Sequence, residues 1–306
     1  MSDADKKSSP RPLVPVVREE GAFPAGDGTA LFARSVRPAD AGDCWARVCL
    51  APGYGDHGGR YEHVLTHLAE QGVAASVLDF RGQGRAGGRR GYARRWDDYV
   101  DDWALFLAGE AGRWKAAAGL GPPPRFLLGH SHGALVTIVA ALEGRLPPDV
   151  RGVVLTAPYL RLKMAPPPAK LRLARAADRV LPWLTVRTDV PEAWMTDDPQ
   201  MLAADRADPL SLGVATPRWF LATLARQQEA LSRAGEFSLP LRVIAGDRDE
   251  LADSAAARDF CEAAGSADRS FGHYPELRHE PLRETRRDAI LADILAWLRE
   301  RSEPAA

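Results

Sequence analysis

The segment RFLLGHSHGA, residues 125–134, decides how the rest of the chain is interpreted. It begins as a short apolar run typical of a strand, turns at Gly-x-Ser-x-Gly, and continues into the apolar helical pattern of residues 133–140. In a nucleophile elbow, such a turn holds its Ser in a strained conformation, and the two Gly residues avoid collisions with the adjacent strand and helix. The pattern predicts that Ser131 is a nucleophile. An ordinary Gly-rich turn between a strand and a helix is the alternative.

A second Gly-rich loop follows an earlier strand-like run. Residues 51–60, APGYGDHGGR, come after an apolar run and before a helical pattern. Gly53 lets the backbone point N–H groups inward, and a loop at this position can supply one donor of an oxyanion hole. We expect the backbone N–H groups of Tyr54 and His132 to form the oxyanion hole together. His132 is a candidate because the helix after Ser131 directs its positive end toward an oxyanion. A phosphate-binding loop is disfavoured because no Gly-Lys-Ser/Thr follows.

Strand-like and helix-like segments alternate along most of the chain, which predicts an α/β fold with a mostly parallel eight-stranded sheet flanked by helices. The alternation stops at residues 160–211, where prolines interrupt helix-like sequence and no strand signal stands out. We therefore expect a disordered tail at 1–12, a core formed by 13–159 and 212–306, and a helical cap, or lid, inserted at 160–211. The predicted strands are residues 14–18, 30–36, 45–50, 73–80, 125–128, 150–156, 241–245 and 269–274, and the predicted helices are residues 61–71, 96–114, 133–140, 170–180, 217–234, 255–264 and 284–301.

A serine hydroxyl is a poor nucleophile at neutral pH, and it needs a base together with a carboxylate that orients the base. Hydrolases with an elbow of this kind carry them in the order Ser, Asp, His, in loops after late strands. Asp249 and His279 follow the last two predicted strands in that order. Asp247 and Asp253 are rivals for the carboxylate, but Asp247 suits a turn and Asp253 suits a helix cap.

Other histidines compete with His279, and each has a structural explanation. His63 and His67 share one helix face, and His273 lies within a predicted strand. His130 and His132 flank the nucleophile, where we expect them to pack and to line the pocket. Two histidines there could also indicate a metal, but no carboxylate or cysteine stands at ligand spacing. We therefore predict neither a metal nor a cofactor.

Composition limits the classes of function. The 306 residues carry 40 Lys+Arg against 41 Asp+Glu, a net charge of -1 that gives no electrostatic case for nucleic acid. We interpret the arginine-rich runs at 81–95 and 172–179 as solvated charged surface. The three cysteines, at 44, 49 and 261, lack disulfide or zinc spacing and are expected to be small buried or half-buried residues. With neither a signal-peptide core nor an apolar run of membrane-spanning length, we expect a cytoplasmic protein.

Short motifs spread over residues 30–301 resemble one known family. They are GYGDH at 53–57 with GRY at 59–61, Asp79 with RGQGR at 81–85, DYVDD at 98–102, GHSHG at 129–133, LTAP at 155–158, Gly246-x-x-Asp249, and His279. Together they resemble the monoacylglycerol lipase and bacterial lysophospholipase branch of the α/β-hydrolases. The resemblance implies the α/β-hydrolase fold and the triad of Ser131, Asp249 and His279.

The sequence departs from that family at two places near the expected site. Pro52 stands where family members often have His before the oxyanion-loop Gly. His132, with Gly133-Ala134, stands where they often have Met and then Gly-Gly. Neither change removes a backbone N–H donor, but both change the shape and polarity of the pocket.

The triad predicts a serine hydrolase that acts through an acyl-enzyme, and the family resemblance implies that it cleaves the single acyl ester of a monoacylglycerol or lysophospholipid. A short-chain carboxylesterase or a serine peptidase with the same triad is the alternative, and a non-catalytic ligand-binding protein would be expected to have lost a triad member. Epoxide hydrolases and dehalogenases are disfavoured because they use Asp as the nucleophile. The expected partner is a small lipid or ester, with transient contact between the cap and a membrane surface. The expected substrate-binding residues are Gly53, His130, Trp183, Leu184 and Trp194, although the apolar cap residues could equally form the core of the cap.

Overall fold

The computed structural model describes residues 13–115, 122–188 and 190–302, so the predicted disordered tail at 1–12 lies outside the described residues. The strands are β1 (Val16–Pro24), β2 (Ala30–Pro38), β3 (Ala46–Ala51), β4 (Val73–Asp79), β5 (Arg125–His130), β6 (Val150–Thr156), β7 (Val186–Arg187), β8 (Val214–Ala215), β9 (Leu241–Ala245) and β10 (Arg269–His273). The α-helices are α1 (Glu62–Glu70), α2 (Asp97–Lys115), α3 (His132–Leu142), α4 (Pro168–Val180), α5 (Pro199–Ala207), α6 (Pro217–Ser232), α7 (Ser254–Ala263) and α8 (Arg287–Ser302). Short 3-10 helices include η2 (Gly58–Tyr61), η3 (Glu192–Trp194) and η5 (Pro281–Arg283).

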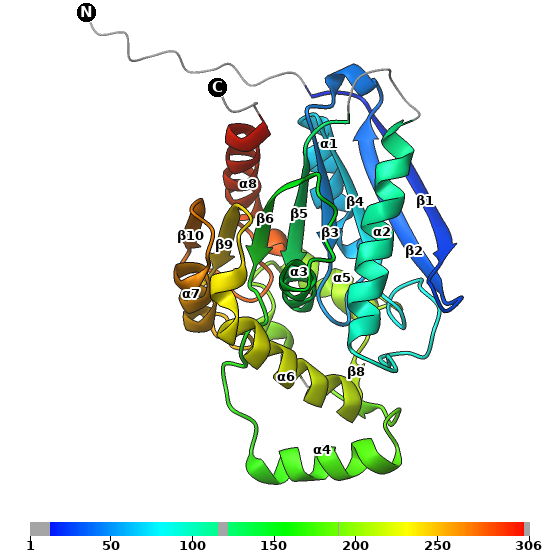
Figure 1. The fold of residues 1–306 in the computed structure, drawn as a ribbon, viewed down its shortest axis with the longest axis vertical. Coiled ribbons are helices and arrows are strands. Elements are labelled where there is room, and N and C mark those ends of the chain that lie inside the picture. The colour runs from blue at the N-terminus through cyan, green and yellow to red at the C-terminus, as the bar shows by residue number, and fades with distance from the viewer. Residues whose placement is uncertain (1–12, 116–121, 189, 303–306) are drawn as a thin grey trace, which may run out of the picture.

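One eight-stranded sheet runs through the molecule in the order β1-β2-β4-β3-β5-β6-β9-β10 (Figure 1). The first two strands pair antiparallel with each other, β2 pairs antiparallel with β4, and all further pairs are parallel. Every residue of β3, β4 and β5 is buried, as expected for parallel strands covered on both faces. The predicted mostly parallel eight-stranded α/β fold is confirmed.

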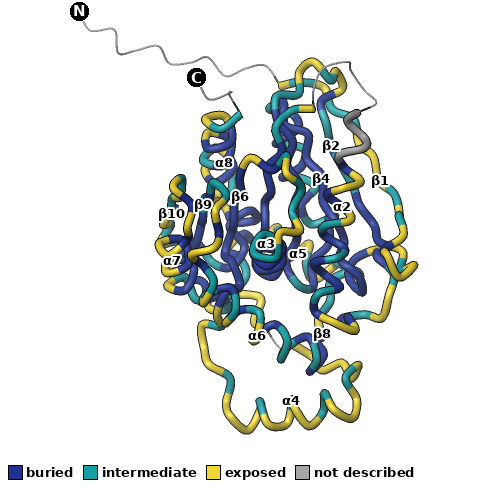
Figure 2. The backbone as a smooth tube through the Cα atoms, viewed as in Figure 1, coloured by how far each residue is buried: buried dark blue, intermediate teal, exposed yellow. Residues whose placement is uncertain are grey.

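Alternate strand residues supply two separate cores. In β3, Val48 and Leu50 pack with α1 and α8 on one face, whereas Cys49 and Ala51 pack with α2, α3, α6 and α7 on the other. This division follows from the two-residue period of a strand. Figure 2 shows the result as a buried central sheet between helices with exposed outer sides.

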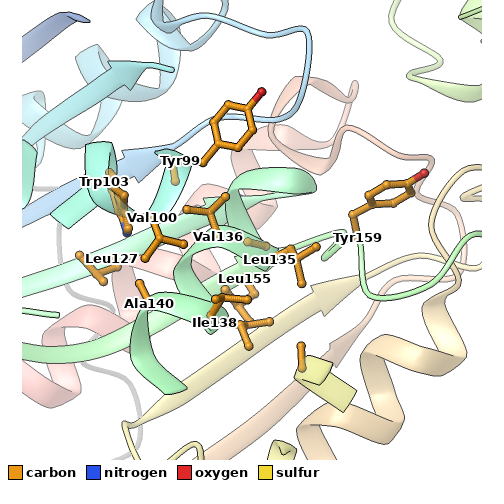
Figure 3. Packing of buried hydrophobic residues seen from close by; sticks show 14 of the residues in the cluster. Tyr99, Val100, Trp103, Leu127, Leu135, Val136, Ile138, Ala140, Leu155 and Tyr159 are labelled. Carbon is orange, nitrogen blue, oxygen red and sulfur yellow. The ribbon is translucent and has the colours of Figure 1, made fainter. Parts of the chain in front are cut away.

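Helix α3 lies in the middle of the larger core. Its residues from His132 to Ala140 are all buried, so the helix is surrounded by protein. Figure 3 shows Leu135, Val136 and Ile138 of α3 packed beside Val100 and other side chains of α2, β5 and β6. This packing fixes the start of α3, and therefore the turn that precedes it.

The chain leaves the sheet after β6 and returns to it at β9. Between these strands, α4 packs against α6 and lies well away from the sheet, while α5 lies near α1 (Figure 1). The prediction that no strand occurs here was wrong at one point, because β7 pairs with β8. Each of these strands has two residues, which is too short to produce a recognisable pattern in the sequence.

Two other expectations need correction. β1 extends to Pro24 rather than ending at Arg18, because an edge strand that pairs antiparallel with β2 over its whole length needs no apolar alternation. Arg81 is not solvated surface, because its buried guanidinium lies 2.7 Å from both carboxylate oxygens of Asp102 and 2.8 Å from Asp27.

Cys49 and Cys261 are buried and Cys44 is half-buried, as expected. Among helices within the described ranges, none combines the length and apolar character needed to cross a bilayer.

Candidate active site

Ser131 occupies a sharp turn between the end of β5 and the start of α3. Its φ of 49° lies in a region that L-residues rarely adopt. The flanking glycines are required by space, since a Cβ at Gly129 would lie 2.7 Å from the Cα of Ala134, and one at Gly133 would lie 2.1 Å from the carbonyl oxygen of Ala51. The strained backbone and the missing side chains are the features that the Gly-x-Ser-x-Gly pattern predicts.

Loops after β9 and β10 bring a carboxylate and an imidazole to this serine. The Nε2 atom of His279 lies 2.9 Å from Ser131 Oγ, and its Nδ1 atom lies 2.8 Å from Asp249 Oδ2. Asp249 is fixed in turn, because its Oδ1 accepts the N–H groups of Leu251 and Ala252, each at 2.8 Å. Gly246 lets the two loops approach, since a Cβ there would lie 2.3 Å from the carbonyl oxygen of Leu277.

The electrostatic environment favours a proton on His279. Burial alone disfavours the imidazolium, because both His279 and Asp249 are only 2% exposed. The charge and the hydrogen bond of Asp249 outweigh this effect, and the nearby carboxylates Glu280 and Asp56 add to it, so the pKa of His279 is raised above its ordinary value. A carboxylate at Nδ1 leaves Nε2 free to accept the hydroxyl proton of Ser131.

The rival acidic residues are engaged elsewhere. Asp247 forms a 2.8 Å contact with His273 Nε2 in an exposed position. Asp253 caps α7 by accepting the N–H of Ala255 at 3.0 Å. Within the described ranges, no cluster of three or more His, Cys, Asp or Glu side chains could hold a metal ion.

The loop before α1 passes directly beside the serine. A Cβ at Gly53 would lie 3.6 Å from the Cβ of Ser131. The N–H of Gly55 donates to Gln83 Oε1 at 2.6 Å and is therefore turned away from the serine. Within the residues that the structure describes, the N–H groups of Tyr54 and His132 have no protein acceptor, which leaves them available to an oxyanion.

Gln83 was not among the predicted site residues. Its fully buried side chain comes from the loop after β4, the Arg-Gly-Gln-Gly-Arg motif of the sequence. From the same motif region, Asp79 Oδ1 accepts the N–H of Gly58 at 2.6 Å. The motif therefore fixes the backbone of the loop that carries Tyr54. That the Arg-Gly-Gln-Gly-Arg motif lies close to the loop that carries Tyr54 could have been inferred only from the order of the strands in the sheet.

The two histidines beside Ser131 are buried and neutral. Burial lowers the pKa of His132 to about 3, and burial together with the neighbouring charge of His279 lowers the pKa of His130 to about 3. His132 Nε2 accepts the indole N–H of Trp219 at 3.2 Å, and the Tyr54 ring stacks on the same indole with centroids 3.7 Å apart. Tyr54 and His132, whose backbone N–H groups are the oxyanion-hole candidates, therefore both pack their side chains on Trp219.

The predicted substrate-binding residues fall in two places. Gly53 and His130 lie beside the triad, where the imidazole centroids of His130 and His279 are 5.3 Å apart. The carbonyl oxygen of Trp194 accepts the N–H of His279 at 3.2 Å. Trp183 and Leu184 instead follow α4, with 41% and 43% of their surfaces exposed.

Comparison with known proteins places the chain in a family. The model of the family described as serine aminopeptidase, S33, matches residues 43–286. The monoacylglycerol lipase of Mycolicibacterium smegmatis is 31% identical over 94% of this chain and 99% of its own length. The human monoglyceride lipase is 28% identical over 91% of this chain and 90% of its own length, and phospholipase YtpA of Bacillus subtilis is 25% identical over 82% and 94%.

Solved structures agree on the fold. A soluble variant of the monoglyceride lipase from Saccharomyces cerevisiae superposes with a TM-score of 0.81 at 21% identity, covering 98% of this chain and 99% of that one. The monoacylglycerol lipase of Paleococcus ferrophilus gives a TM-score of 0.73 at 21% identity over 94% and 100%. The chain therefore belongs to the serine aminopeptidase S33 family and has the α/β-hydrolase fold.

Proposed function

We propose that the protein is a serine ester hydrolase that cleaves the single acyl ester of a monoacylglycerol or a lysophospholipid. The observation that carries this proposal is the continuous chain from Ser131 through His279 to Asp249, with contacts of 2.9 and 2.8 Å. The relatives named as monoacylglycerol lipase and phospholipase support an ester substrate with a lipid chain.

Acylation begins when Ser131 Oγ attacks the ester carbonyl and its proton passes to His279 Nε2. The imidazolium is stabilised by Asp249, which is buried and already oriented by two backbone N–H groups. The negative charge that develops on the carbonyl oxygen is received by the N–H groups of Tyr54 and His132. His279 then donates its proton to the departing alcohol, which leaves an acyl-enzyme on Ser131.

Deacylation repeats these steps with water. His279 takes a proton from the water, the hydroxide attacks the acyl carbonyl, and the bond to Ser131 Oγ breaks as the serine regains its proton. The fatty acid is released. Each step uses the same base, the same carboxylate and the same pair of N–H donors, so no further group is required.

The inserted residues 160–211 are proposed to form the cap over this site and to select the acyl chain. Eight of the ten large apolar side chains that are exposed in the described structure lie between residues 164 and 190. Exposed apolar side chains concentrated in one segment indicate a surface for an apolar ligand or partner. We propose that part of it receives the acyl chain and that its outer side makes transient contact with a lipid surface.

A hydrolysis panel tests this function. p-Nitrophenyl esters from two to sixteen carbons, a monoacylglycerol and lysophosphatidylcholine are compared at equal enzyme concentration. Aminoacyl p-nitroanilides provide the peptidase arm. We expect kcat/KM to rise with chain length and one of the two lipids to be cleaved. A maximum at acetate or butyrate would favour a short-chain carboxylesterase, and cleavage of the anilides alone would contradict the ester hydrolase proposal.

A further inference from the structure

The residue after the candidate base is a buried, doubly bound carboxylate. Glu280 is 2% exposed, its Oε1 lies 2.8 Å from Arg60 Nη2, and its Oε2 lies 2.5 Å from Arg283 Nη1. Arg60 belongs to η2 and Arg283 to η5, so two separate elements clamp one carboxylate. Burial raises the pKa of Glu280 above its ordinary value, and the charges of Arg60 and Arg283 oppose this effect.

The same two arginines reach the inserted segment. Asp205 of α5 accepts from Arg60 Nη2 at 2.9 Å and from Arg283 Nη1 at 3.0 Å. Arg60 Nε also lies 2.9 Å from Asp56 Oδ1, in the loop that carries Tyr54. The cluster therefore joins the oxyanion loop, α5 and the loop of the candidate base.

Backbone contacts reinforce this attachment. The N–H of His279 donates to the carbonyl oxygen of Trp194 at 3.2 Å, and the N–H of Glu280 donates to that of Met195 at 2.9 Å. The dipeptide that carries the base is thus held by its main chain on one side and by the Glu280 side chain on the other.

The charges around His279 come from several elements. Asp249 contacts its Nδ1, Asp56 faces it from the oxyanion loop, and Glu280 adjoins it in sequence. His130 packs against it from β5 and is neutral. Arg60 and Arg283 lie beyond Glu280 and Asp56, whose charges they balance.

We propose that Glu280 is a positioning residue for His279, which it holds in place through Arg60 and Arg283 and whose imidazolium it stabilises during acylation. The proposal rests on the proposed function, because it takes His279 to be the base. A purely structural clamp would make the same contacts, so the two roles must be separated by charge rather than by geometry.

Substitutions at the two ends of the Glu280–Arg283 pair give opposite electrostatic effects. Glu280→Gln removes a negative charge and leaves the arginines less balanced, so the pKa of His279 falls. Arg283→Gln removes a positive charge, so that pKa rises. Both changes loosen the same clamp. A structural role would therefore slow both variants without moving their pH dependence in opposite directions.

The test follows the rate of Ser131 modification by a small fluorophosphonate between pH 5 and 9, alongside kcat and KM for a p-nitrophenyl ester. A protonated base is inactive, so the rate falls on the acid side with the pKa of His279. We call this fall in rate at low pH the acid limb. We expect the acid limb to move down by about one pH unit in Glu280→Gln and up in Arg283→Gln. We expect kcat to fall about tenfold in Glu280→Gln with little change in KM.

Control variants distinguish failure of the proposed function from failure of the role proposed for Glu280. Asp205→Asn weakens the same arginine cluster without removing a charge adjacent to His279, and its limb should stay within about 0.2 pH units of the wild-type limb. Glu280→Asp keeps the charge and should restore the limb while kcat remains reduced. If wild-type Ser131 is not modified, the proposed function fails. If it is modified and neither substitution moves the limb, the role of Glu280 is disproved. If Glu280→Gln does not fold, the upward shift in Arg283→Gln decides the question.

Discussion

The two parts of the segment between β6 and α6 differ in what holds them. The α5 part, residues 192–212, is attached to the core by partly buried polar contacts, including the Asp205 cluster and a 2.7 Å contact between Asp208 and His57. Neither helix has a buried residue, but the α4 part, residues 160–188, is mostly exposed around its helix (Figure 2). Its large apolar side chains Leu173 and Val180 are 71% and 73% exposed.

This difference indicates a division of roles. Buried ion pairs add little net stability, and we infer that the pairs around Asp205 instead hold α5 in one arrangement. Exposed apolar surface is costly in water and is expected to contact a ligand or partner. We infer that the α5 part maintains the geometry of the base, whereas the α4 part selects the substrate and approaches lipid.

Substitution of a triad residue should have the largest effect on kcat, and the effects of the α5 and α4 parts are compared with it. We expect Asp249→Asn to lower kcat by about 10⁴, because His279 loses the acceptor that fixes its tautomer. Asp247→Asn, which alters an exposed pair with His273, should leave kcat nearly unchanged. Equal losses in the two variants would remove Asp249 from the triad, and a kinetic assay with one short ester is sufficient.

Substitutions that break the attachment of the α5 part should have the next largest effect. Arg60→Met leaves Glu280, Asp56 and Asp205 with fewer counter-charges, and breaking such a buried cluster typically costs about 3–5 kcal/mol of stability. We expect a lower Tm and a fall in kcat of the same factor for acetate and for long-chain esters. Arg206→Met, which removes an exposed pair with Glu192, is the matched control and should keep both values.

A chain-length-dependent loss in the Arg60 variant, or an equal loss in the Arg206 control, would break the distinction between the two parts.

The α4 part should affect specificity rather than rate. Each buried methylene contributes about 0.8 kcal/mol, so losing contacts with two of them reduces affinity for the chain by about tenfold. Trp183→Ala should therefore lower kcat/KM for long-chain esters by roughly that factor and leave acetate hydrolysis unchanged. Leu105→Ala, at an exposed position on α2, is the control. A uniform loss over all chain lengths would place Trp183 in the packing of the cap.

Association with lipid is the smallest expected effect. Replacing Leu173 and Val180 by Ser removes two exposed apolar side chains from α4. We expect several-fold weaker sedimentation with phosphatidylcholine–phosphatidylglycerol vesicles and normal hydrolysis of soluble acetate ester. Leu105→Ser should sediment like the wild type. Unchanged sedimentation of the double variant would show that lipid contact, if present, uses another surface.

Most of the sheet could be predicted because buried parallel strands leave mostly apolar runs, as in β4 and β6. Ser131 could be predicted because its two flanking glycines, at which a Cβ would lie 2.7 Å and 2.1 Å from backbone atoms, give the recognisable pattern Gly-x-Ser-x-Gly between a strand and a helix. The Glu280 cluster could not, since its members come from η2, α5 and η5 and meet only after folding. β7 and β8 were missed because a strand of two residues is too short to show an alternation of apolar and polar side chains.

The central claim is that Ser131 is the nucleophile of an acyl-enzyme mechanism. Its most direct test is mass spectrometry of the intact protein and its peptides after reaction with a long-chain fluorophosphonate, with Ser131→Ala as the control. We predict one adduct per chain, located on the peptide that contains Ser131, and loss of ester hydrolysis in proportion to labelling. An adduct on another residue, or a Ser131→Ala variant that keeps more than a tenth of wild-type turnover, would contradict the account.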